Sequence, residues 1–233
     1  MDSCLVISCE HGGHKLPPAY GGLFVRADAV LASHRGWDPG ALQLARQFAR
    51  SLGAPIFAST TTRLLVDLNR SIGHRQLFSE FGRGLDRNAR QQILARHYAP
   101  HRAAVETTIG RQIAAGKRVI HIASHSFTPV LDGVLRQADV AWLYDPRRAA
   151  EAAFARHWMA ELGLRAPQLR LRRNYPYQGR ADGLTALLRK RHCGASYVGI
   201  ELEVNQRFVQ QGGAAWSALR QALVDSLSAA LAH

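Results

Sequence analysis

Four polar clusters in this sequence contain residue types that do chemistry: histidines, carboxylates, and an adjacent asparagine and arginine. They are Ser8-Cys9-Glu10-His11, the segment 63–70, Ser124-His125-Ser126, and the segment 201–205. Each lies at or near the end of an apolar run of strand length. Histidine and carboxylate groups are common zinc ligands, and an arginine guanidinium matches a carboxylate in shape and charge. Together the clusters indicate a metal-dependent hydrolase that acts on an acidic substrate.

The segment 63–70, Arg-Leu-Leu-Val-Asp-Leu-Asn-Arg, is the most informative of the four. We predict a buried strand over 64–68, with Arg63 at its start and with Asn69 and Arg70 at its end. A strand needs no charged residues at its ends in order to pack. The Asn-Arg pair therefore favours binding of a substrate carboxylate. An ordinary polar strand terminus is the alternative for this cluster and for each of the others.

His11 and His125 are the leading candidates for metal ligands, because each follows an apolar strand directly. A catalytic zinc takes about three protein ligands and keeps one position open for water. The hydroxyl groups of Ser124 and Ser126 can orient His125 or its neighbours. Either histidine alone is equally consistent with a structural role.

Asp38 and two further histidines are secondary ligand candidates. Asp38 precedes Pro39, and this pair is typical of a helix N-cap followed by proline at the first helical position. That gives Asp38 a structural explanation of its own. His14 and His34 lie in irregular loops.

Glu201 and Glu203 belong to one predicted strand and project from the same face, since side chains along a strand alternate. Two carboxylates in an otherwise apolar strand are costly unless they are used. One of them can act as the general base that deprotonates the attacking water and then protonates the leaving amine. The alternative is an edge strand with one solvated face.

The cysteines exclude a disulfide framework. Cys4, Cys9 and Cys193 are odd in number and have no C-x-x-C spacing, which also excludes a structural zinc motif. Cys9 stands beside Glu10 and His11 and is either a nucleophile or, as we favour, a small buried strand residue.

The net charge of +13 requires nucleic-acid binding to be considered, and it comes almost entirely from arginine. The basic residues are spread along the chain, and only 170–173 and 189–191 form clusters. No zinc finger, glycine loop or aromatic-rich RNA motif accompanies them. We therefore expect no nucleic-acid partner, although a non-catalytic basic nucleic-acid-binding protein is the competing hypothesis from another class.

The length of 233 residues and the alternation of strand and helix patterns predict a single domain over 1–233. The fold class is α/β, a three-layer arrangement with a mixed or largely parallel central sheet. Strands are expected over 5–9, 55–58, 64–68, 119–123, 138–144, 169–172 and 197–204. Helices are expected over 40–52, 86–115, 149–162, 184–191 and 214–231, with Gly53, Gly116 and Gly163 at the ends of the first three.

No apolar run approaches the roughly 20 residues that a transmembrane helix needs. The first eight residues carry no basic leader and no cleavage site, so they are interpreted as the first strand. We expect a cytoplasmic protein with no membrane partner.

The four clusters, with a fifth motif, resemble the N-formylglutamate amidohydrolase family. The motifs are Ser-Cys-Glu-His-Gly-Gly, His-Arg-Gly-Trp-Asp-Pro-Gly-Ala, Arg-Leu-Leu-Val-Asp-Leu-Asn-Arg, Ser-His-Ser and Glu-Val-Asn-Gln, in the expected order from 8 to 206. The family is similar in turn to zinc carboxypeptidases and to the aspartoacylase and succinylglutamate desuccinylase group. The resemblance implies a zinc-carboxypeptidase-like three-layer sandwich with a mixed sheet and a single zinc at the strand ends. It implies hydrolysis of the amide bond of an N-acyl amino acid that carries a carboxylate, such as N-formylglutamate.

Carried over by position, the resemblance makes His11, Asp38 and His125 the metal ligands. Asp38 stands where related amidohydrolases have histidine. Related sequences also have aspartate two residues before the third ligand, where this chain has Ala123. A carboxylate that orients the metal site is then missing or is supplied from elsewhere.

The resemblance also assigns the remaining roles. Glu203 becomes the general base, with Glu201 as the alternative, and Arg63 polarises the scissile carbonyl. Asn69 and Arg70 hold the substrate carboxylate. A later loop lines the specificity pocket with Asn174, Tyr175, Tyr177 and Arg180. The alternative is that this loop is a tight turn with no substrate role. The acyl group, the amino acid and the oligomeric state stay open.

Overall fold

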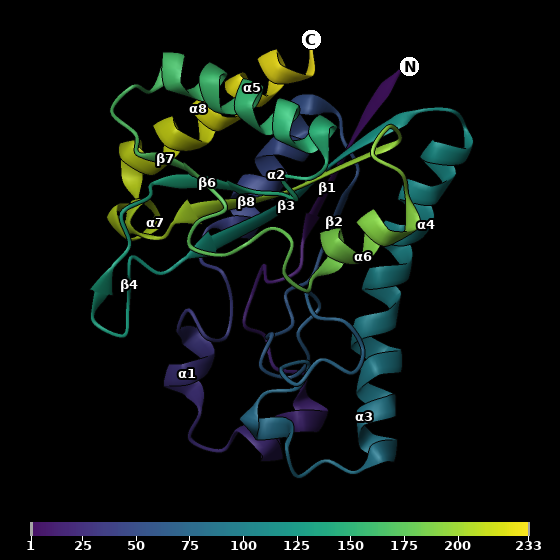
Figure 1. The fold of residues 1–233 in the computed structure, drawn as a ribbon. Coiled ribbons are helices and arrows are strands. Elements are labelled where there is room, and N and C mark those ends of the chain that lie inside the picture. The colour runs from purple at the N-terminus through teal and green to yellow at the C-terminus, as the bar shows by residue number, and fades with distance from the viewer. Residues whose placement is uncertain (1, 233) are drawn as a thin grey trace.

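The computed structural model describes residues 2–232 and is built around a six-stranded mixed sheet (Figure 1). The strand order is β2-β1-β3-β8-β6-β7. Four strands run parallel, and β6 is antiparallel to β8 but parallel to β7. The bounds are β1 Ser3–Cys9, β2 Ile56–Ala58, β3 Arg118–Phe127, β6 Val140–Leu143, β7 Leu171–Arg173 and β8 Tyr197–Asn205.

Helices cover both faces of this sheet, because successive side chains of the buried central strands point to opposite faces. One face packs against α2 (Ala41–Leu52), α5 (Ala149–Arg165) and α8 (Gly213–Leu231), with Ile7, Phe48 and Trp158 in its core. The other packs against α4 (Ala99–Ala114) and α6 (Leu184–Arg191), with Val6 and Tyr197 in its core. The predicted three-layer α/β sandwich is confirmed.

Shorter elements and loops lie beyond the carboxyl ends of the parallel strands and have their own apolar cluster, which includes Phe24, Leu31 and Ile93. The helix expected over 86–115 forms as α3, a π-helical turn and α4, and the Asp86 carboxylate caps it by accepting from the Ala89 backbone N–H. The remaining short elements are η1 Pro18–Phe24, α1 Asp28–Ala32, η2 Glu80–Gly82, α3 Arg87–Ile93, η3 Leu94–Tyr98 and α7 Arg207–Gln211.

The prediction of a strand over 64–68 is wrong. These residues form turns and an irregular segment, and their buried leucines pack into the loop cluster rather than into the sheet. A short apolar run signals burial but does not specify pairing with another strand. The hydrogen bond from the Leu65 N–H to the Thr62 carbonyl and the ion pair between Arg63 and Asp67 fit a turn and not an extended chain.

Three element boundaries also differ from expectation. Gly40, with φ of 82°, takes the N-cap position of α2, so the Asp38 carboxylate caps no helix. Helix α5 passes through Gly163 and continues to Arg165, because a single glycine weakens a helix without ending it. Strand β3 extends to Phe127, which places His125 within the strand and not after it.

A small hairpin of β4 (Val130–Leu131) and β5 (Val134–Leu135) was not predicted. Its turn is Asp132-Gly133, and both residues have positive φ. An Asp-Gly pair between apolar residues is a strong hairpin signal, so the sequence did contain the information. No helix within 2–232 is long and apolar enough to cross a membrane.

Candidate metal centre and active site

The predicted metal ligands meet at the carboxyl ends of the parallel strands, where α/β sheets bind ligands. His11 follows β1, and His125 lies near the end of β3. Asp38 arrives on the loop before α2, which is anchored by a 2.9 Å hydrogen bond from the Asp38 N–H to the His11 carbonyl. Three segments that are far apart in sequence therefore supply this group.

His11, Asp38 and His125 are buried, and one potential ligand atom from each lies within 4.8 Å of the other two. Asp38 Oδ2 lies 2.9 Å from His125 Nδ1 and 3.4 Å from His11 Nδ1. Two imidazole nitrogens thus converge on one carboxylate oxygen. Two histidines and a carboxylate are a donor set that can hold a divalent metal ion such as zinc.

Two carboxylates that were not predicted hold the far nitrogens of these histidines. Asp67 Oδ1 lies 2.7 Å from His11 Nε2, and Glu10 Oε2 lies 3.0 Å from His125 Nε2. A carboxylate on one ring nitrogen fixes the ring and leaves the other nitrogen free to bind a metal. Glu10 is thus placed to act as the orienting carboxylate that the sequence does not provide at Ala123. Both residues stand inside the quoted motifs, but the interpretation of 64–68 as a strand concealed Asp67.

The charges of the group favour a cation at its centre. Although burial acts in the opposite direction, His11 and His125 hold the pKa of the Asp38 carboxyl below its usual value. Burial likewise opposes the shift at His125, but Asp38 and Glu10 raise the pKa of its imidazole well above the ordinary value. Buried carboxylates around imidazoles stabilise a positive charge, which either a proton or a metal ion can supply.

Within residues 2–232, neither serine hydroxyl beside His125 hydrogen-bonds to its ring. Ser126 Oγ donates to the Pro39 carbonyl, and Ser124 Oγ donates to the Ala41 carbonyl. They join β3 to the loop that carries Asp38. Their predicted orienting role is thus exerted on the neighbouring ligand's loop.

Glu203 and Glu201 differ in their surroundings although both face the same cavity. In the parallel register of β3 and β8, Glu203 is opposite His125 and Glu201 is opposite Ala123. Glu201 Oε1 accepts a 2.6 Å hydrogen bond from the Thr185 hydroxyl. Glu203 Oε2 is buried and has no hydrogen-bond partner among residues 2–232. Burial raises the pKa of the Glu203 carboxyl to about 8; Asp38 and Glu201 also raise it, whereas His125 opposes the shift.

Arg63, Asn69 and Arg70 also reach this cavity, each held by a protein partner. Arg63 Nη2 donates to Asp67 Oδ2 at 2.7 Å. Asn69 Oδ1 accepts from the Leu184 backbone N–H at 2.8 Å. Arg70 Nη1 donates to the backbone carbonyl of Asp182 at 2.7 Å, while its buried Nε has no partner in the described chain.

The catalytic cavity, as we name it, has a volume of about 320 Å³. Phe127, Asp182 and Gln206, which were not predicted, line it. Nine of the predicted site residues also line it: His11, Asp38, Arg63, Asn69, Arg70, His125, Tyr177, Glu201 and Glu203. Asn174 and Arg180 do not line it. The Asn174 side chain instead accepts from the backbone N–H groups of Tyr144 and Gly179, which stabilises its own loop. Tyr175 similarly accepts from the Gln137 N–H, outside the cavity.

The other candidates from the sequence lie apart from the metal group. His14 packs against Trp37, and His34 lines the cavity but is not among the three converging residues. Cys9 is fully buried, and burial raises the pKa of its thiol well above the ordinary value. A thiol in that setting is a poor nucleophile, so the small buried strand residue is the better interpretation.

Comparison with known proteins gives one family match and related structures. The model of the N-formylglutamate amidohydrolase family matches residues 3–209. A crystal structure of an Agrobacterium tumefaciens gene product is similar with a TM-score of 0.83 and 28% identity, over 98% of this chain and 90% of that one. N-formylglutamate amidohydrolase from Ralstonia eutropha is similar in fold, with a TM-score of 0.70 and 18% identity, over 99% and 94% of the two chains. No curated protein matches the sequence.

Proposed function

Since this chain belongs to the N-formylglutamate amidohydrolase family, we propose that it is a zinc-dependent hydrolase of N-acyl amino acids that carry a carboxylate. N-formylglutamate is the model substrate. The observation that carries the proposal is the convergence of His11, Asp38 and His125 beside Glu203, whose Oε2 has no hydrogen-bond partner among residues 2–232.

The residues present fit a catalytic zinc. His11 and His125 would bind it through Nδ1 and Asp38 through Oδ2, while the far ring nitrogens stay on Asp67 and Glu10. When bound, such an ion supplies Lewis-acid activation of water and of the substrate carbonyl.

Glu203 is the general base of the proposed reaction. It accepts a proton from the attacking water as the water oxygen bonds to the amide carbon. It then delivers that proton to the nitrogen as the C–N bond breaks, releasing a carboxylic acid and a free amine. Glu203 suits this role better than Glu201, because the Glu201 carboxylate already accepts from Thr185 and lies two residue pairs further from His125 in the strand register.

Asn69 and Arg70 are the residues proposed to bind the substrate carboxylate. Arg70 is anchored through one nitrogen and has further donors for an anion. Arg63, positioned by Asp67, lies on the same cavity and can polarise the scissile carbonyl. The acyl group is not specified by any of these contacts.

Metal analysis tests the proposal directly. We expect about one zinc per chain, loss of N-formylglutamate hydrolysis on chelation, and recovery when zinc is returned. His11→Ala should bind no metal and be inactive, whereas His14→Ala, a histidine outside the group, should keep both properties. Full hydrolysis by metal-free protein would refute the mechanism. A metal-free, inactive protein that binds RNA or DNA with steep salt dependence would support the competing binding-protein hypothesis.

A further inference from the structure

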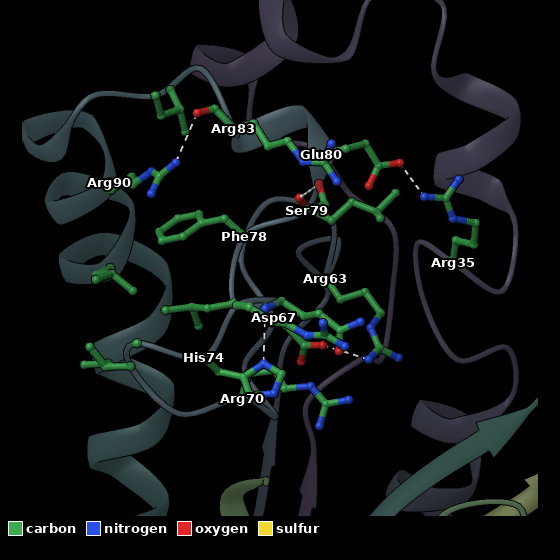
Figure 2. A pocket seen from close by; sticks show the side chains of 18 of the residues that line it. Arg35, Arg63, Asp67, Arg70, His74, Phe78, Ser79, Glu80, Arg83 and Arg90 are labelled. Carbon is green, nitrogen blue, oxygen red and sulfur yellow. Dashed lines mark hydrogen bonds and ion pairs between the residues drawn. The ribbon is translucent and has the colours of Figure 1, made fainter.

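A second and larger depression, with a volume of about 940 Å³, adjoins the catalytic cavity. His34, Arg63, Arg70 and Tyr177 line both. We name it the basic groove. Figure 2 shows Arg63, Asp67 and Arg70 grouped at one end of it, with Glu80 and Arg83 at the other and Arg90 on the flanking helix.

The basic groove carries an excess of positive charge that the described chain does not neutralise. Seven arginines line it against two acidic residues. Asp67 pairs with Arg63, and Glu80 pairs with Arg35. The other five have no ion-pair partner among residues 2–232: Arg70, Arg75, Arg83, Arg87 and Arg90.

Part of this charge is held in place by the fold. Arg90 Nη2 donates to the backbone carbonyls of Gly82 and Arg83, and its guanidinium lies 5.4 Å from the centre of the Phe78 ring. The Nε atoms of Arg90 and Arg70 are buried and have no hydrogen-bond partner in the described chain. Arg70 and Arg90 are only partly buried and line the groove, so their more accessible guanidinium nitrogens can donate to an anionic ligand there.

From this arrangement we propose that the preferred substrate is an N-acylated acidic peptide, whose first residue is the N-acyl amino acid of the proposed reaction. Its N-acyl end lies in the catalytic cavity, and its following acidic residues lie along the basic groove. This inference rests on the proposed function. The catalytic cavity accommodates the acylated residue, and the adjoining groove, about three times larger, accommodates the rest of the chain. Arg70, which lines both, would contact the first carboxylate.

The test compares N-formylglutamate, N-formyl-tetraglutamate and the uncharged N-formyl-tetraglutamine. A groove variant combines Arg75→Gln, Arg83→Gln and Arg87→Gln, which are exposed and outside the metal group. A control variant removes the same charge from exposed arginines of other helices through Arg50→Gln, Arg111→Gln and Arg156→Gln. Deformylation is measured for each. Binding of C-terminally labelled N-formyl-tetraglutamate is measured by anisotropy in the Glu203→Gln background.

We expect the wild type to prefer tetraglutamate in both kcat/KM and affinity, and the groove variant to lose about tenfold for that peptide alone. Hydrolysis of N-formylglutamate should not change, and the control variant should resemble the wild type.

Equal hydrolysis of the tetraglutamate and tetraglutamine peptides, or equal losses of peptide hydrolysis in the groove and control variants, would overturn the inference. Hydrolysis of N-formylglutamate in the same experiment would leave the proposed function intact. If polyuridylate binds at the same arginines more tightly than N-formyl-tetraglutamate does, the groove is assigned to RNA and the inference is also overturned. If no N-formyl compound is hydrolysed, the proposed function itself fails.

Discussion

The catalytic cavity and the basic groove hold their charged groups in opposite ways. In the cavity, His11, Asp38 and His125 are buried and come from strand ends or an anchored loop, and the two histidines contact further carboxylates. In the groove, Arg75, Arg83 and Arg87 are exposed; the first two belong to the connection between residue 70 and α3, and Arg87 is the first residue of α3. Chemistry needs fixed atoms, because a small displacement of a catalytic group is costly. Attraction of an anionic chain tolerates mobile charges.

The two regions meet at residues that belong to both. Arg63 is tied to Asp67, which in turn holds His11, so the groove contacts the support of the metal group directly. Arg70 is fixed on one side by the Asp182 carbonyl and open on the other. Substitutions in the catalytic cavity should therefore lower turnover, whereas substitutions in the basic groove should weaken substrate binding.

The largest effect is expected from Glu203→Gln. The substitution keeps the shape of the side chain but removes the proton acceptor, so turnover should fall by about 10²–10⁴-fold. Zinc content and substrate affinity should be retained. Single-turnover kinetics with metal analysis provide the measurement, and Glu201→Gln is the matched control on the same strand face. If Glu201→Gln is inactive while Glu203→Gln turns over normally, the role belongs to Glu201.

The rate–pH profile gives a second readout for Glu203. A general base must be deprotonated, and burial raises the pKa of this carboxyl to about 8, so activity should rise as the pH passes the pKa of the working enzyme. A bound cation lowers that pKa by stabilising the carboxylate. The residual activity of Glu203→Gln should lack this limb of the profile.

Arg70→Ala should affect binding more than turnover. We expect KM to rise by roughly 10–150-fold for acidic substrates, since losing a charge-assisted hydrogen bond typically costs ~1.5–3 kcal/mol. An uncharged N-acyl amide should lose far less. Steady-state kinetics on a panel of N-formyl, N-acetyl and N-succinyl amino acids would measure this difference. Equal losses on acidic and neutral substrates would make Arg70 a structural residue that anchors the Asp182 segment.

Glu10→Gln should weaken the metal site without removing a ligand. Its carboxylate contacts His125 Nε2, and loss of such a partner typically lowers metal affinity by about 10–100-fold. Competition with a chromogenic chelator measures the zinc Kd, and the effect should be smaller than that of Asp38→Ala. Unchanged zinc affinity with a lowered melting temperature would show that Glu10 only stabilises the fold.

The sequence predicted several elements of the sheet and of its covering helices closely. The helix over 184–191 is confirmed to the residue, and the strand over 197–204 ends only one residue later than expected. It failed at 64–68, where burial comes from a loop cluster that no local pattern reveals. The convergence of His11, Asp38 and His125 was predictable because these residues lie in short motifs that resemble a known family. The basic groove was not, because its arginines are scattered from 35 to 90 among many other arginines and only the folded chain brings them together.

The smallest expected effect is that of salt, and it separates the two regions without any substitution. Charges exposed to solvent are screened more strongly than buried ones, and the Debye length falls from about 10 Å at 0.1 M to about 3 Å at 1 M. Raising the salt from about 0.05 M to about 0.5 M should weaken binding of N-formyl-tetraglutamate a few-fold, because Arg75, Arg83 and Arg87 contribute through solvent. The KM for N-formylglutamate should change less, since the residues proposed to bind its carboxylate, Asn69 and Arg70, are less exposed than these three arginines. Titrations of both ligands across the salt series, repeated with the groove variant, measure the difference. Equal salt slopes for the two ligands would mean that the exposed arginines take no part in binding. The contrast between buried groups in the catalytic cavity and exposed charges in the basic groove would then not describe how this protein binds its substrate.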